Sequence, residues 1–492
     1  MLHRKRNPIK TGVFASAIAL SGMLGTVSGS LAQLTSVMGK PAKETKTKEL
    51  NLTPRAAPMP ALQYRLLPLD PERTPGDAAP IYLRLVGEKT REELDELAKK
   101  SMAWLELPLD QMPTAEARKF VDGWGTQIEQ LTYGARRQHC EWNYTLPEER
   151  EKSFDIQLSD VQQMRQWARL LALKARVEIA ENKYKDAIRT LETGMAFSRH
   201  IAEGPFFIHT LVGIAAAHLM LDRVEELIAQ PEAPNLYWSL TALPRPLIDV
   251  RQAMETEQKV LEWMIPEITE LDRPRAEEEW APLLARLYAR MSEMDRKYAE
   301  KGPAGNSYGP KTTDLASFKT ELLPKAREYL RARAMEGGPE AGRLSDDRAV
   351  VLYIAEKYHD IRDAWFRLQY LPYPEASVME ADTLKFVYAE KSGPMRVFVS
   401  LLPNVMGVHL SETRLDHRVA ALRIVEALRM YADANGGELP KSLDQVKIVP
   451  IPLNPATGKD FVYHREGNAA VLDSTMPPLR TLGISYRITL RK

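Results

Sequence analysis

Cysteine is almost absent from this chain, because Cys140 is the only one in 492 residues. A single thiol cannot form an intramolecular disulfide, so the burial of apolar side chains must hold the fold together. This excludes the small secreted domains that depend on disulfides. For an exported chain it favours a protein of the bacterial cell envelope.

A strong excess of one charge is also absent. The chain has 67 Lys and Arg against 66 Asp and Glu, a formal net charge of +1. The first 32 residues hold four of the basic residues and no acid, so without them the balance is 63 against 66, or −3. A near-neutral protein has no strong field that attracts nucleic acid or an anionic membrane. We therefore expect no nucleic-acid partner.

Long apolar runs are confined to the N-terminus. Basic residues at positions 4, 5, 6 and 10 precede an apolar stretch from Val13 to Val27, and Ser30-Leu31-Ala32 matches the small-x-small cleavage rule. The stretch is short of the roughly 20 residues that a spanning helix needs. We predict a signal peptide over residues 1–32 and a periplasmic or extracellular mature protein, with an uncleaved anchor as the alternative. After cleavage we expect no integral membrane segment.

Catalytic motifs are missing as well. The sequence contains no H-E-x-x-H, G-x-S-x-G or G-x-G-x-x-G pattern. Glu356-x-x-His359 is half of a carboxylate-bridged iron motif, but no second Glu-x-x-His is present. His209 and His218 lie on an alanine-rich helix and are expected to be core histidines. We therefore predict no metal-binding or cofactor-binding residues and no cofactor.

His139-Cys140 is the only candidate nucleophile pair. Adjacent residues on a helix do not face each other, so adjacency alone does not activate the thiol. Trp142 and Tyr144 follow closely, which suits a buried thiol. We therefore predict no catalytic residue.

The clearest structural pattern is a pair of helices over Gln166–Glu181 and Tyr184–Arg199. Apolar residues recur at spacings of three and four in both, and the short connector makes the helices antiparallel neighbours. The pair resembles one tetratricopeptide repeat, with a Tyr-x-x-Ala start to its second helix. No second copy follows at a period of 34 residues, so an array is not expected.

Further helices are expected on both sides of two Gly/Pro-rich loops. The sequence favours a short helix wedged into the core over an aromatic ligand platform in 230–246, and a kinked or broken helix near Pro403. The loops should be exposed. The expected long helices are 205–228, 277–300, 314–333 and 346–371, and the loops are 301–311 and 336–347.

The stretch "PLNPATGKDFVYHREGNAAVL" (452–472) decides between a phosphate-binding loop and a hairpin. A phosphate-binding loop needs Gly five residues before Gly458 and Ser or Thr after Lys459, but Leu453 and Asp460 stand there. Strand-forming residues follow on both sides of a Glu-Gly-Asn turn, so we predict a hairpin. A helix precedes it, ends at Gly436-Gly437, and is expected to be polar on the face of Arg423, Glu426, Arg429 and Asp433.

These C-terminal residues resemble a known module. The helix with "ALRIVEALRMYADANGGELP" and the hairpin from "PLNPATGKDFVYHREGNAAVL" are similar to the C-terminal part of type II secretion pseudopilins. The sequence departs from that family at Asn454, where Asp is usual, and after the hairpin, where "STMPPLR" replaces an acidic calcium-binding loop.

The whole chain resembles a family of exported proteins from planctomycete-type bacteria. The stretches that carry the likeness are "LQYRLLPLDPERTPGDAAPIYLRL" (62–85), "PNLYWSLTALPRPLID" (234–249) and the C-terminal module. The resemblance implies export and a helical body with a small C-terminal appendage, and it implies no activity.

The expected fold is mainly α: an irregular helical-hairpin body with one tetratricopeptide-like pair, then a small C-terminal α+β module of a helix and a short antiparallel hairpin. The expected divisions are a signal peptide (1–32), a linker (33–61), a helical domain (62–411) and a pseudopilin-like α+β module (412–492).

We expect a non-enzymatic scaffold or protein-interaction protein of the bacterial cell envelope, with an unknown protein partner. An exported hydrolase with an acidic site between helices remains an alternative, and it requires two close carboxylates with shifted pKa values in a deep cleft. A component of a secretion or pilus apparatus is the second alternative, and it requires the C-terminal module to dock on other pilins.

Overall fold

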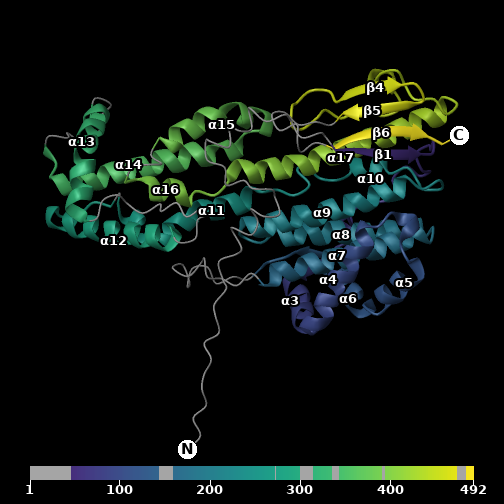
Figure 1. Cartoon of the computed structure of the whole chain (residues 1–492), viewed down its shortest axis with the longest axis horizontal. Helices are drawn as coiled ribbons and strands as arrows, with labels where there is room; N and C mark the ends of the chain where they lie inside the picture. The colour runs from purple at the N-terminus through teal and green to yellow at the C-terminus, as the bar shows by residue number, and fades with distance from the viewer. Residues whose placement is uncertain are drawn as a thin grey trace, which may run out of the picture.

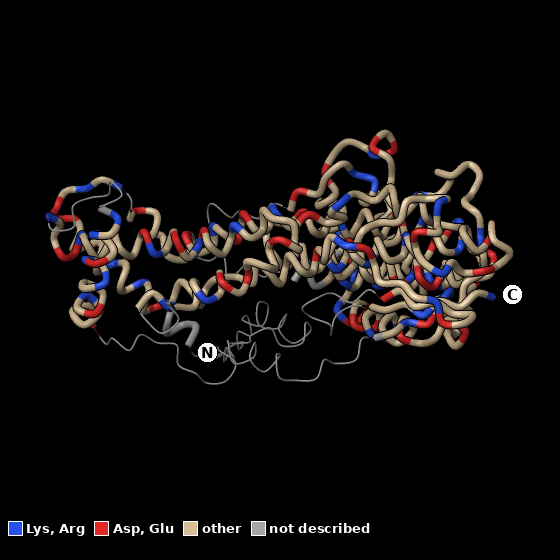
Figure 2. The backbone as a smooth tube through the Cα atoms, turned by 90° about the horizontal axis from the view of Figure 1, so that it is seen from above, with Lys and Arg blue, Asp and Glu red and all other residues tan. Residues whose placement is uncertain are grey.

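The computed structural model describes residues 46–142, 159–271, 273–299, 314–334, 343–389, 394–473 and 484–491. The expected signal peptide, the first part of the expected linker and most of the two Gly/Pro-rich loops lie outside these residues. Within them the protein consists of a thick body, drawn at the right of Figure 1, and a long helical arm that extends from it to the left. Both signs of charge are interspersed along body and arm (Figure 2).

The fold is mainly α-helical, as predicted, with a small sheet that contains the C-terminal strands. The body contains α3 (Ala79–Gly87), α4 (Arg91–Glu106), α5 (Thr114–Asp122), α6 (Gly125–Ala135), α7 (Ser159–Ala180), α8 (Tyr184–Ala202), α9 (Phe207–Ile228) and α10 (Tyr237–Thr241). The arm contains α11 (Arg251–Met264), α12 (Trp280–Ala299), α13 (Leu315–Ala334), α14 (Asp346–Phe366), α15 (Tyr373–Tyr388) and α16 (Arg396–Leu401), and α17 (Val405–Ala434) returns into the body.

The predicted pair of helices is confirmed as α7 and α8, and α9 packs against both. The connector between α7 and α8 holds Asn182 at φ 59°, a left-handed conformation that Asn tolerates better than most residues. Glycine lets α8 and α9 approach closely, since a Cβ at Gly213 would lie 2.6 Å from the carbonyl oxygen of Ser198. The interior of the body is therefore a layer of three packed helices in which α8 and α9 are in direct backbone contact.

α9 has the length and apolar composition of a membrane-spanning helix, which the sequence analysis did not expect of any segment after the N-terminus. Its most apolar window has a mean hydropathy of 1.3, and 72% of that window is buried inside the protein. The helix is apolar over most of its surface because α7, α8 and α17 pack around it, and its charged residues lie in its last two turns. A central core helix therefore accounts for its composition.

Other helices also agree with their predicted positions. The wedged helix is α10, where Tyr237 and Leu240 are fully buried. The break near Pro403 is present between α16 and α17, and Asn404 caps α17 by accepting the Gly407 N–H. The break occurs at Pro403, because proline has no backbone N–H to donate to a helical hydrogen bond.

The C-terminal hairpin is confirmed as β4 (Val462–Glu466) and β5 (Ala469–Asp473), paired antiparallel around Gly467 at φ 61°. Two further strands were not predicted. β6 (Ile484–Leu490) pairs antiparallel with β5, and β1 (Lys46–Leu52) pairs parallel with β6. The sheet order is therefore β1-β6-β5-β4. A second, two-stranded sheet joins β2 (Thr74–Asp77) to β3 (Arg137–His139).

Two expected divisions differ from the structure. Residues 46–52 of the expected linker form β1. The side chains of Leu50 and Leu52 are buried in the core, and Lys48 forms ion pairs with acids on α9. The expected boundary between 411 and 412 falls inside α17, which runs unbroken for 30 residues. The C-terminal sheet is thus completed by an N-terminal strand and shares its helix with the body.

A buried ionic cluster joins that sheet to the helices. Arg418 of α17 donates to Glu225 and Asp222 of α9, and Lys48 of β1 reaches the same two acids. The hydroxyl of Tyr486 on β6 donates to Glu225 at 2.6 Å. Because opposite charges surround it, Arg418 keeps a pKa above its ordinary value despite burial. The cluster connects both ends of the described chain to the core helices.

Candidate functional site

The candidate site is a surface cleft of about 570 Å³ in the body, which we call the tyrosine cleft. Three segments that are distant in sequence form its walls: the loop after β1, the α7–α8 connector with the start of α8, and the loop before α10. The lining residues are Arg55, Ala56, Ala57, Pro58, Tyr64, Asn182, Lys183, Tyr184, Lys185, Asp186, Glu232, Pro234 and Asn235.

The lining of the cleft combines aromatic and proline side chains with a charged rim. Tyr64, Tyr184, Pro58 and Pro234 are each partly buried, so part of their surface faces the cleft. The Tyr184 hydroxyl donates to the side-chain oxygen of Asn182 at 2.7 Å, which fixes the ring orientation. Tyrosine and proline surfaces of this kind suit contact with extended peptide.

Basic groups outnumber acidic groups among the lining residues. Arg55 donates to the Pro231 carbonyl and lies 3.4 Å from Glu232, and the exposed Lys183 lies 2.8 Å from Glu181. Lys185 is exposed on the rim. Burial raises the pKa of Tyr184, and the charge of Glu232 adds to this rise. The cleft therefore offers ammonium and guanidinium groups beside an apolar floor.

A fully buried ion pair inside α17 fixes two walls of the cleft. Arg429 and Glu426 are both 0% exposed, and the guanidinium lies 3.1 Å from the carboxylate. Arg429 also donates to the backbone carbonyls of Thr53 and Ala233, each at 3.0 Å. The same side chain thus holds the segment after β1 and the segment before α10.

Asn235 completes this anchoring from the other wall. Its side-chain amide donates to the carbonyl of Glu426 at 2.9 Å, and its side-chain oxygen accepts the Tyr237 N–H at 3.0 Å. The backbone N–H of Arg55 donates to the carbonyl of Arg429 at 3.1 Å. The walls are therefore preorganised by buried polar contacts, which lowers the entropy that the wall segments would lose when a ligand binds.

This anchoring contradicts one expectation. The helix that became α17 was expected to be polar and exposed on the face of Arg423, Glu426 and Arg429, but all three are buried. The reason is that the α10 segment and the loop after β1 cover that face and supply carbonyl partners. The exposed Asp433 remains as predicted.

A second cleft of about 450 Å³ contains the predicted thiol. It is lined by His139, Cys140, Glu141, Trp142, Glu203, Pro205 and Gln252. Cys140 is 1% exposed, and burial raises the pKa of its thiol well above the ordinary value, with the charge of Glu203 adding to the rise. Its backbone N–H donates to Glu203 at 2.6 Å. A thiol kept protonated in this way is a poor nucleophile.

The histidines examined in the sequence are distributed as follows. His209 is buried, and Nδ1 of His218 accepts a hydrogen bond from the Arg418 guanidinium at 3.4 Å, with burial lowering the pKa of His218 to about 3. His359 stacks at a tilt on Tyr358. Among the residues that the structure describes, no group of three or more His, Cys, Asp or Glu side chains could hold a metal ion.

The acidic pair that a hydrolase requires has a partial counterpart on α17. Burial raises the pKa of Glu412 to about 8 and that of Asp416 to about 6. Each carboxylate accepts a backbone N–H, from Val250 and Leu247 respectively, and neither lines either cleft. Their environment is that of a structural anchor.

Sequence reasoning found the elements of the tyrosine cleft but not the cleft itself. Tyr184 was noted only as the start of a tetratricopeptide-like helix. The available signal was the charged i, i+3 pair of Glu426 and Arg429 within a helix that is otherwise rich in apolar residues. The partners of that pair lie near residues 53 and 233, which no local pattern indicates.

No protein-family model, no curated protein and no solved structure matches this chain.

Proposed function

We propose that this chain is an exported, non-enzymatic interaction protein of the bacterial cell envelope, and that the tyrosine cleft binds an extended, acidic segment of a partner protein. The observation that carries the proposal is the preorganised cleft of about 570 Å³ with its tyrosine and proline lining. The N-terminal basic and apolar pattern supports export.

The lining explains why an extended segment is the favoured ligand. Two tyrosine rings and two prolines offer flat apolar surfaces, which grip proline-rich segments in a polyproline II conformation. Such segments lose little conformational entropy on binding. Lys185 supplies a positive charge that complements an acidic side chain on the ligand, beside Arg55 and Lys183, which pair with Glu232 and Glu181.

The test is a binding titration of the mature protein with a defined peptide. A fluorescent acetyl-Pro-Pro-Glu-Pro-Pro-Glu-amide probe is followed by anisotropy, and a version with Lys in place of Glu tests the charge. We expect saturable binding of the acidic probe and about tenfold weaker binding of the basic one, because the rim charges oppose the basic probe.

Two variants connect the binding to the cleft. Tyr184→Ala removes a partly buried ring from the lining and should weaken binding about tenfold. Lys185→Glu reverses a rim charge and should reduce the preference for the acidic probe. Tyr370→Ala in the arm and Lys99→Glu on α4 are matched controls, since both side chains are exposed and lie outside the cleft. The proposal would be refuted if the acidic probe shows no saturable binding, or if the control variants lose as much binding affinity as the cleft variants.

A further inference from the structure

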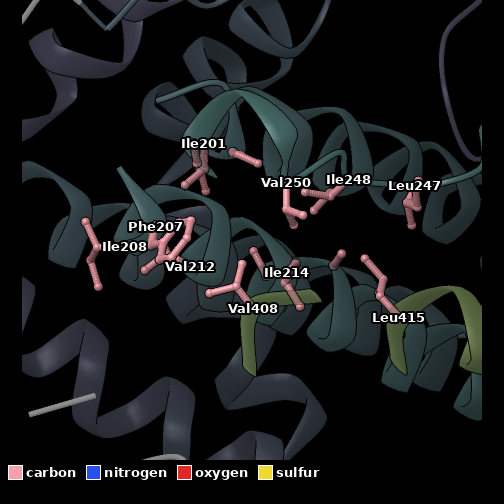
Figure 3. Close-up of a cluster of buried hydrophobic side chains, with 14 of the residues drawn as sticks. Ile201, Phe207, Ile208, Val212, Ile214, Leu247, Ile248, Val250, Val408 and Leu415 are labelled. Atoms are coloured by element: carbon pink, nitrogen blue, oxygen red, sulfur yellow. The ribbon is translucent and has the colours of Figure 1, made fainter. Parts of the chain in front are cut away.

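The chain crosses between body and arm at a packed junction. One crossing is the segment 242–250 between α10 and α11, and the other is 402–404 between α16 and α17. Figure 3 shows that the first crossing lies against α8, α9 and α17, with apolar side chains turned toward one another. The buried side chains there include Ile201, Phe207, Val212, Ile214, Leu247, Ile248, Val250, Val408 and Leu415.

Two carboxylates of α17 hold the backbone of this crossing segment. Glu412 accepts the Val250 N–H at 3.2 Å, and Asp416 accepts the Leu247 N–H at 2.9 Å. The side chains of Leu247 and Val250 are buried in the apolar cluster. The segment is therefore fixed by apolar contacts and by two hydrogen bonds to neighbouring turns of one helix.

The two carboxylates sit in a poorly solvated environment with few cations. For Glu412 burial raises the pKa most, the hydrogen bond from the Val250 N–H lowers it, and the like charges of Asp416 and Asp249 raise it further against the opposing Arg251. For Asp416 burial also raises the pKa most, and the hydrogen bond from the Leu247 N–H and the charge of Arg245 lower it by less. Two residues four apart on a helix lie on the same face, so their negative charges repel each other when both are ionised.

The remaining titratable groups around Glu412 do not neutralise it. His409 Nε2 lies 3.8 Å from the Glu412 carboxylate, but burial lowers the pKa of His409 to about 4, so it is neutral above that pH. Tyr373 packs edge-on against His409, and its pKa is about 12. Asp249 is itself paired with Arg251.

From this geometry we propose that Glu412 and Asp416 form a pH-dependent latch on the crossing segment, which holds the start of the arm firmly in mildly acidic solution and loosens it in mildly alkaline solution. Protonated carboxyls still accept the backbone N–H groups through the carbonyl oxygen, and they remove the repulsion. Ionised carboxylates favour a loosened segment in which water can reach them.

The direction of the pH dependence follows from the difference in proton binding between the latched and the loosened state. In a loosened, hydrated segment the two acids have their ordinary pKa values of 4.5 and 3.8, whereas in the latched state the values are about 8 and about 6. The latched state therefore binds protons more tightly. The free-energy advantage of the latched state is complete below the ordinary pKa values of the two acids, and it is lost as the pH rises through about 6 and about 8.

The test is hydrogen–deuterium exchange of the full-length mature protein at pH 6 and pH 8.5. The readout is protection of the peptide that covers Leu247 to Val250, expressed relative to a Glu412→Gln/Asp416→Asn variant at the same pH. This ratio cancels the intrinsic dependence of exchange on pH. We expect the relative protection of the wild type to fall about tenfold or more between the two pH values.

A matched control is Glu255→Gln on α11, an exposed acid close to the crossing segment. This variant should show the same change in relative protection between pH 6 and pH 8.5 as the wild type. If the double variant does not fold, Asp416→Asn alone serves as reference and should remove part of the change. A protection ratio that is the same at pH 6 and pH 8.5 would overturn the latch.

Discussion

Replacing Arg429 by Met removes a side chain that connects α17 to both the segment after β1 and the segment before α10. The substitution leaves the Glu426 carboxylate at 0% exposure without its cation, and the carbonyls of Thr53 and Ala233 without that donor. Burial already raises the pKa of Glu426, and Arg429 is the strongest influence that lowers it. The variant therefore contains an uncompensated buried acid.

The expected cost is about 3–5 kcal/mol in the free energy of unfolding, because breaking a buried ion pair from one side strands the other charge. A second variant, Arg429→Met/Glu426→Gln, removes the stranded charge and should be more stable than the single variant by about 2 kcal/mol. The two substitutions are strongly coupled, since the side chains contact each other directly.

The assay is urea unfolding followed by tryptophan fluorescence, with the midpoint and slope compared across the wild type, Arg429→Met, Glu426→Gln and the double variant. Arg189→Met is the control, because Arg189 is 80% exposed and its ion pair with Asp186 should contribute within about 0.5 kcal/mol. The reasoning is refuted if Arg429→Met costs no more than the control, or if the double variant is less stable than the single one.

Three further substitutions test other parts of the structure. Tyr486→Phe deletes the buried hydrogen bond to Glu225 and should cost about 1–2 kcal/mol in urea unfolding, whereas no change would show that the cluster does not depend on it. Gly213→Ala places a Cβ against α8 and should cost about 1–3 kcal/mol by thermal unfolding, unless α8 and α9 separate freely. Burial raises the pKa of Glu257 from 4.5 to about 7, so the contribution of Glu257 to stability declines as the pH rises between these values. Glu257→Gln should flatten this decline in the free energy of unfolding by about 3 kcal/mol at most. An unchanged pH profile would contradict the assignment.

The sequence predicted the parts of the fold that depend on local periodicity and local turn chemistry. The α7–α8 pair, α10, the break at Pro403 and the β4–β5 hairpin follow from apolar spacing, proline and glycine. Gly467, for example, occupies a left-handed turn position that its neighbours could not adopt as easily. Each of these features is encoded by one continuous stretch of the chain, so a window of sequence contains it.

The features that the sequence did not predict depend on contacts between distant segments. β1 lies in a polar stretch that reads as linker, and it becomes a strand only because β6 provides the pairing edge. Arg429 reads as a solvent-facing charge until the carbonyls of Thr53 and Ala233 come beside it. Tertiary contacts override local pattern in both cases, and the tyrosine cleft arises from the same contacts.

The parallel pairing of β1 with β6 also constrains the order of folding. Lys46 pairs with Ile484, so nearly the entire polypeptide must be synthesised before the first strand finds its neighbour. Closing so large a loop is slow and entropically unfavourable until the intervening helices are compact. Under the export that we propose, the machinery that threads the unfolded chain would encounter an N-terminal segment that is still unpaired, and completion of this sheet would be a late step of folding after translocation.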